Sequence, residues 1–99
     1  MNQAIKKNDD EIVNFCKRNH IMKFSFFGSV LREDFSPESD VDVLVEFESG
    51  HVPGLAFFRM ELELSQILGR KVDLQTPKFL SPLIRSQVLS EADIQYDAA

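Results

Sequence analysis

The chain has 99 residues, a net charge of −5 and a single cysteine, which exclude an internal disulfide and disfavour direct binding of nucleic acid. With 43% hydrophobic residues, nine of them phenylalanine, it can form one buried core, so we expect a single domain over residues 1–99. It contains no apolar run long enough to span a bilayer and begins with no signal peptide, and we therefore expect a soluble, cytoplasmic protein.

The first half of the chain predicts two helices and two strands. Residues 9–18 form an expected helix, because acids fill its first turn, bases fill its last turn and apolar residues recur at helical spacing. Residues 21–27 are rich in Phe and Ile and predict a strand, which Gly28 ends. A short helix is expected over about 29–34, then a loop. Residues 41–47 alternate between apolar and polar side chains and predict a second strand.

The second half predicts two more helices and two more strands. Residues 55–68 carry an apolar stripe at helical spacing, and Gly69 lies where a left-handed helix cap is expected. A short strand is expected over 72–75, a helix over 80–89 and a last short strand over 94–96. This mixture indicates an α+β (α/β) fold, a small mixed sheet with helices packed on one face.

Three aspartates in or directly before the predicted strands suggest a metal site. Asp40 and Asp42 are two residues apart and therefore project to the same face. Two carboxylates about 4 Å apart repel each other by roughly 4 kcal/mol, which protonation of one of them or a cation between them would relieve. If the strand of Asp73 pairs beside that of Asp42, three acids could hold two Mg²⁺ ions, with Mn²⁺ as the alternative. The competing interpretation is that these acids are solvated strand ends.

The turn after the first strand suggests a phosphate site. Gly28 allows a tight turn that brings the backbone close to a phosphate, and the following amides and the Ser29 hydroxyl can donate to phosphate oxygens. Arg32, about one helical turn further on, can reach the β- or γ-phosphate. The predicted nucleotide-binding residues are Gly28, Ser29, Arg32 and Ser39. The alternatives are a plain turn glycine and an exposed arginine.

Three segments carry a family resemblance: FFGSVLREDFSPESDVDVLVEF, KVDLQT and EADIQYDA. The chain resembles the minimal nucleotidyltransferases of the DNA polymerase beta-like superfamily, and in particular the MNT-domain antitoxins that are paired with HEPN-domain toxins. The resemblance implies that Gly28 and Ser29 hold the triphosphate of ATP and that Asp40, Asp42 and Asp73 are catalytic and bind metal. It also implies an enzyme that transfers AMP to a tyrosine of its partner toxin. Glu33 departs from the pattern, since many relatives have a small residue there.

Two other functions remain open at this point. One is an antitoxin that neutralises its toxin by binding alone, and the other is a nucleotidyltransferase for a small molecule, which the short chain disfavours. The remaining polar residues suggest no second site. His20 and His51 lack the spacing of metal ligands and are expected at the surface, and Cys16 is expected in the core.

Overall fold

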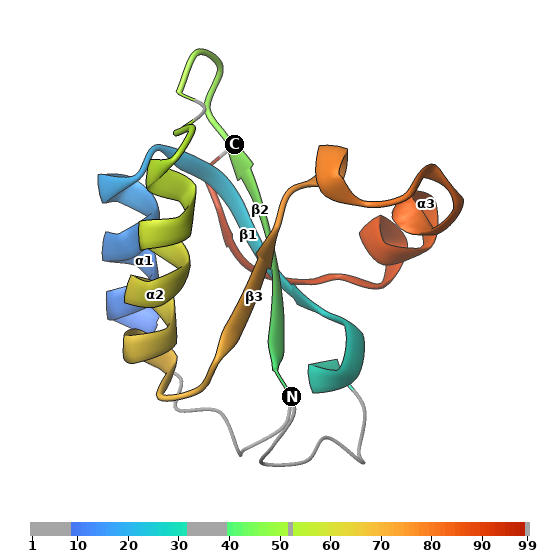
Figure 1. The fold of residues 1–99 in the computed structure, drawn as a ribbon, viewed down its shortest axis with the longest axis horizontal. Coiled ribbons are helices and arrows are strands. Elements are labelled where there is room, and N and C mark those ends of the chain that lie inside the picture. The colour runs from blue at the N-terminus through green and yellow to red at the C-terminus, as the bar shows by residue number, and fades with distance from the viewer. Residues whose placement is uncertain (1–8, 32–39, 52, 99) are drawn as a thin grey trace.

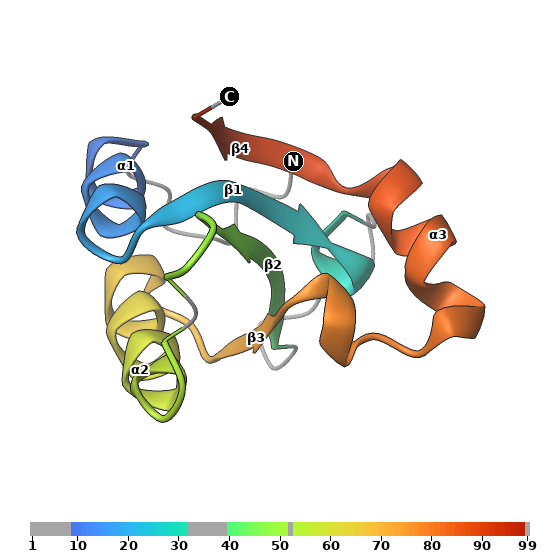
Figure 2. The same ribbon diagram turned by 90° about the horizontal axis from the view of Figure 1, so that it is seen from above.

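A four-stranded mixed sheet is the framework of the fold in the computed structural model of the chain, which describes residues 9–31, 40–51 and 53–98 (Figures 1 and 2). None of the helices within these ranges has the length and apolar character needed to cross a membrane. The elements in chain order are α1 (Asp9–Arg18), β1 (Ile21–Phe27), the 3-10 helix η1 (Gly28–Leu31), β2 (Val41–Phe47), α2 (Ala56–Leu68), β3 (Val72–Gln75), the 3-10 helix η2 (Pro77–Phe79), α3 (Pro82–Glu91) and β4 (Asp93–Asp97).

The strands lie in the order β3-β2-β1-β4, so β3 and β4 are the two edges of the sheet. β1 pairs antiparallel with both β2 and β4, whereas β2 and β3 are parallel. Parallel neighbours need a crossover connection, and α2 provides it by running back along the sheet between β2 and β3. The pairing of β2 with β3 joins segments that are about thirty residues apart in the chain.

One face of the sheet is covered by α1 and α2, which lie side by side in both views (Figures 1 and 2). Alternate residues of β1, β2 and β3 point into this layer and meet the apolar stripes of the two helices. Burial of this many large side chains is the main stabilising term of the fold. The core consists of Ile12, Phe15, Cys16, Ile21, Phe24, Phe26, Val41, Val43, Val45, Phe57, Met60, Leu64, Leu68, Val72 and Leu74.

The described residues cover the other face of the sheet only in part. Phe27 and Leu44 point to this side and form a small second cluster with Leu80, against which Val88 and Ala92 pack at the end of α3. The predicted fold class is confirmed, but the expectation that the helices pack on one face holds only for α1 and α2. The helix α3 lies on the opposite side, because β4 returns to pair with β1 and carries α3 across the second face (Figure 2).

The predicted strands over 21–27, 41–47 and 72–75 agree with the structure to the residue. The helix expected over 80–89 begins later, at Pro82, and is preceded by η2. The reason is local, since proline fits the first helical turn and the Ser81 hydroxyl accepts the Leu83 N–H at 3.3 Å as an N-cap. Of the helix expected over 29–34, the described part is the 3-10 turn η1.

Cys16 provides a test of the core. Burial raises the pKa of its thiol from 9.0 to about 12, so the folded chain binds this proton more tightly than the unfolded chain does. Its contribution to stability is therefore complete below pH 9 and is lost as the pH rises toward 12. Between about pH 8 and about pH 10.5 we expect the wild type to lose about 2 kcal/mol more free energy of unfolding than Cys16→Ala, measured with urea. Equal losses would contradict the burial of this thiol.

Candidate active site

Asp42 and Asp73 are direct neighbours in the sheet. They are paired Cα partners in the parallel register of β2 and β3. The apolar residues on either side of each aspartate are buried in the main core, so alternation turns both carboxylates to the second face of the sheet, where both residues are partly exposed. Asp73 was a candidate on the condition that its strand lies beside that of Asp42. The structure meets this condition.

The Cα atoms of the two aspartates lie at the spacing of neighbouring strands, and their side chains leave the same face. At about 5 Å and an effective dielectric constant near 20, two ionised carboxylates repel each other by about 3 kcal/mol. The Gln75 side chain partly offsets the charge, because its Nε2 donates to Oδ1 of Asp73 at 2.9 Å. Gln75 was not among the predicted residues, although its position two residues after Asp73 on the same strand face was a signal for this contact.

Asp40 lies directly before β2 and is exposed. Its Oδ2 is 3.9 Å from Nζ of Lys71, and with 45% and 81% of the two side chains exposed this ion pair contributes little to stability. Within the described part of the chain, no group of three or more His, Cys, Asp or Glu side chains is arranged to hold a metal ion. The structure thus brings together two of the three predicted acids and places the third beside a lysine.

Gly28 lies against Asp42. The end of β1 pairs with β2 so that Phe27 is the Cα partner of Asp42, and the turn η1 follows at once at the end of the sheet where β2 begins (Figure 1). Gly28 has a φ of +72°, and a Cβ at this position would collide with Oδ2 of Asp42. A glycine is therefore favoured here for two reasons, the left-handed backbone and the close approach of the carboxylate, which any Cβ would displace.

The other predicted nucleotide-binding groups cannot be placed beside Asp42. Arg32 and Ser39 lie outside the described residues, as does the side chain of Ser29. The backbone of Ser29 is described and belongs to η1, directly after Gly28. Of the predicted phosphate site, the structure describes the turn itself and its close approach to Asp42.

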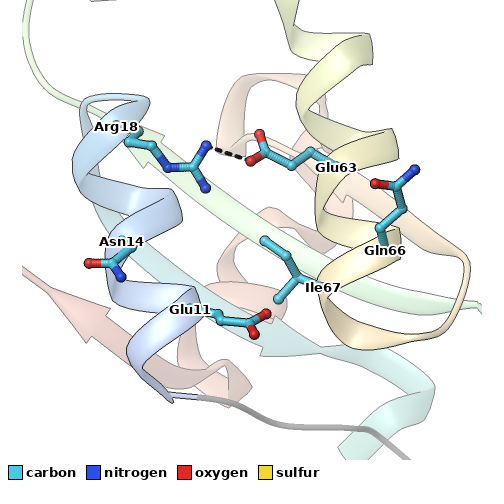
Figure 3. A pocket seen from close by; sticks show the side chains of 6 residues that line it. All are labelled: Glu11, Asn14, Arg18, Glu63, Gln66 and Ile67. Carbon is cyan, nitrogen blue, oxygen red and sulfur yellow. Dashed lines mark hydrogen bonds and ion pairs between the residues drawn. The ribbon is translucent and has the colours of Figure 1, made fainter.

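Two other polar groupings lie away from these carboxylates. The rings of His20 and His51, far apart in sequence, are stacked with centroids 4.0 Å apart. A groove between α1 and α2 is crossed by the ion pair of Arg18 with Glu63 at 2.5 Å (Figure 3). This groove is formed by the two helices that cover the first face of the sheet, so it is separate from Asp42 and Asp73.

The sequence from residue 9 to residue 94 matches the nucleotidyltransferase domain family. The chain belongs to this family. The match covers every element from α1 to the start of β4, including β2, β3 and the Gly28 turn. The prediction that the chain is a nucleotidyltransferase enzyme is therefore confirmed, and the neighbouring aspartates and the glycine turn lie within the matched domain.

Relatives with assigned names support this membership. The chain is 37% identical over 76 residues to the protein adenylyltransferase MntA of Thermococcus cleftensis. The aligned region covers 76% of this chain and 75% of the relative. It is 34% identical over 82 residues to a candidate protein adenylyltransferase of Methanocaldococcus jannaschii, covering 83% of this chain and 87% of the relative. The resemblance to the minimal nucleotidyltransferases that was drawn from the sequence is thereby confirmed.

Solved structures show the same fold. A candidate minimal nucleotidyltransferase has a TM-score of 0.71 with 37% identity, covering 85% of each chain. A chain from a toxin-antitoxin crystal structure with AMP-PNP has a TM-score of 0.74 with 20% identity, covering 92% of this chain and 74% of that one. A chain from the complex of a tri-AMPylated Shewanella oneidensis HEPN toxin with its MNT antitoxin has a TM-score of 0.65 with 20% identity, covering 90% and 69%.

The contact between Gly28 and Asp42 leads to a prediction with a matched control. Gly28→Ala and Gly50→Ala both force alanine into a left-handed backbone, which costs about 1–2 kcal/mol, but a Cβ at Gly50 meets nothing within 4 Å. We expect both variants to lose similar stability in urea, apart from any relaxation around Asp42. Only Gly28→Ala should lose nucleotidyl transfer, on the order of tenfold to a hundredfold, because it displaces Asp42. Equal activity of the two variants would show that this contact has no role.

Proposed function

We propose that this nucleotidyltransferase is a Mg²⁺-dependent protein adenylyltransferase that acts as an antitoxin. It transfers AMP from ATP to a tyrosine hydroxyl of a HEPN-domain toxin and thereby neutralises the toxin. The observation that carries the proposal is the side-by-side placement of Asp42 and Asp73 next to the Gly28 turn. The names of the relatives support AMP as the transferred group, and the folds shared with MNT antitoxins support a HEPN toxin as the partner.

The donor set fits a hard divalent cation. Asp42 and Asp73 present carboxylate oxygens on one face, which Mg²⁺ and Mn²⁺ prefer over nitrogen or sulfur ligands. Asp40, Asp42 and Asp73 would hold the metal, with Asp40 exchanging its contact with Lys71 for the shared site. When bound, the divalent ions would neutralise the phosphate charge and favour deprotonation of the acceptor hydroxyl.

The protein's own groups position the nucleotide. The Gly28 turn brings backbone against the Asp42 carboxylate without a Cβ in between, so the amides of the turn would lie near a phosphate bound at this carboxylate. Ser29, Arg32 and Ser39 supply further donors to the triphosphate in this proposal. Gln75 holds one oxygen of Asp73 by its hydrogen bond and so limits the rotation of that carboxylate.

The acceptor comes from another molecule. The chain has one tyrosine, Tyr96, and this side chain is partly buried against the main core. Among the described residues, by contrast, the second face of the sheet is covered only near Phe27 and Leu44, so a partner protein could approach the partly exposed Asp42 and Asp73 from outside. This arrangement favours transfer to a partner over self-modification.

The direct test is transfer of label. Incubation with α-labelled ATP, Mg²⁺ and the cognate HEPN toxin should label the toxin on tyrosine. Asp40→Ala combined with Asp42→Ala should lower the rate on the order of a hundredfold or more, because the charge of the phosphates is then no longer balanced. Asp10→Ala, which removes an exposed acid on α1, is the matched control and should keep the wild-type rate. Absence of label with the wild type would refute the proposal.

Neutralisation by binding alone is the second candidate, because Asp40 contacts Lys71 and the described residues include no group of three possible ligands arranged to hold a metal ion. Protection of cells from the toxin at normal expression by the Asp40→Ala, Asp42→Ala variant would establish this function instead. Loss of protection by the same variant, with the toxin still bound, would establish catalysis as the means of neutralisation.

Metal binding can be measured without activity. Mg²⁺ should raise the melting temperature of the wild type by a few degrees at millimolar concentration, as expected for a ligand that binds only the folded state. Asp42→Asn should show little of this effect, and without metal it should be at least as stable as the wild type because the repulsion with Asp73 is removed. An equal response of the two proteins to Mg²⁺ would remove Asp42 from the metal site.

A further inference from the structure

The edge strand β3, which carries Asp73, is held on its outer side by two side chains of α2. β3 has β2 as its neighbour in the sheet, and its other edge faces away from the strands. The Val72 N–H donates to Oγ of Ser65 at 3.0 Å, and the Leu74 N–H donates to Oε2 of Glu61 at 2.8 Å. These two amides lie directly before and directly after Asp73.

The spacing of the two side chains matches the spacing of the two amides. Four residues along an α-helix advance about 6 Å, and two residues along a strand advance about 6.6 Å. Glu61 and Ser65 are four residues apart on α2, while the two amides are two residues apart on β3. The helix runs against the direction of the strand, so the earlier helix residue meets the later strand residue. The two contacts therefore oppose sliding of β3 along its own axis relative to α2 and β2.

Sliding of β3 would have a specific consequence for Asp73. A shift by one residue turns every side chain of a strand to the other face. Asp73 would then point into the main core, and its buried neighbours Val72 and Leu74 would be exposed. A four-residue edge strand in a parallel pair has few hydrogen bonds of its own to resist such motion.

Ser65 is itself fixed at the end of α2. Its hydroxyl donates to the backbone carbonyl of Glu61 at 2.8 Å, and its own carbonyl accepts the N–H groups of Gly69 and Arg70 where the helix ends. Gly69 adopts a left-handed conformation, with φ 68°, that turns the chain toward β3. Ser65 is thus tied into the turn that ends α2, and Glu61, one helical turn earlier, is half-buried.

We propose that Glu61 and Ser65 are positioning residues for the transfer reaction, which keep Asp73 opposite Asp42 by binding the outer amides of β3. The inference rests on the proposed role of Asp73 as a metal-binding carboxylate. Neither residue reaches the second face of the sheet, where the reaction takes place. They act through the register of the strand, and the ionised carboxylate of Glu61 forms the stronger of the two contacts.

Amide hydrogen exchange tests the contacts without any activity. In Glu61→Ala the Leu74 amide should exchange at least about tenfold faster than in the wild type, since its acceptor is removed. Glu61→Gln keeps an acceptor oxygen and should stay within about threefold of the wild type. Glu63→Ala is the matched control, because Glu63 lies on the same helix but pairs with Arg18 in the groove of Figure 3. It should leave the Leu74 amide unchanged.

Transfer kinetics test the positioning role. Glu61→Ala should lower kcat about tenfold to a hundredfold and raise the Mg²⁺ concentration needed for half-maximal rate, with little change in KM for ATP. Glu61→Gln should restore most of the rate, which a loss of stability alone would not explain. Ser65→Ala, which leaves the Glu61 contact in place, should have a smaller effect in the same direction and serves as the second variant if Glu61→Ala fails to fold.

The outcomes separate this inference from the proposed function. A wild type that transfers no AMP refutes the proposed function, while the exchange measurement still decides whether the contacts hold β3. A wild type that transfers AMP, together with Glu61→Ala and Ser65→Ala variants that keep its Mg²⁺ dependence and kcat, overturns the positioning role. Unchanged exchange of Leu74 in Glu61→Ala overturns the contact itself.

Discussion

The parallel register of β2 and β3 is the constraint on which the candidate site depends. It places two like charges, Asp42 and Asp73, on adjacent strands of one sheet face, an arrangement that a folded chain tolerates only at an energetic cost. Other contacts offset the repulsion between the two carboxylates. The buried residues that alternate with the two aspartates hold the strands in the main core, and Gln75 donates a hydrogen bond to Asp73. A site that is unfavourable without a cation is well suited to bind one.

The main core and the candidate site lie on opposite faces of the sheet. The face under α1 and α2 contains nearly all of the large buried side chains, and the other face has the aspartates, Gly28 and the small cluster around Leu80. Substitutions in the first layer should act on folding, whereas substitutions on the second face can change the reaction with less effect on the core. The helix α3 lies beside the second face (Figure 2), and Asp42 and Asp73 on that face are partly exposed among the described residues.

Local sequence patterns predicted the strands and most helix positions, since alternation and helical spacing are properties of short segments. The pairing of β2 with β3 could be stated from the sequence only as a condition, because register between segments about thirty residues apart depends on the crossover by α2. For the same reason the stacking of His20 on His51 and the contacts from Glu61 and Ser65 to β3 were not foreseen. The polar residues at a four-residue spacing beside the apolar stripe of α2 were the one available signal for the latter.

The contacts on the outer edge of β3 also bear on how this small protein can associate with others. An edge strand with unsatisfied amides is a template for strand addition by another chain, which can lead to sheet extension or aggregation. Here the outward amides of Val72 and Leu74 already have acceptors within the same molecule. Recognition at this edge would therefore rely on side chains and loops, with no continuous sheet formed across the boundary between the two proteins.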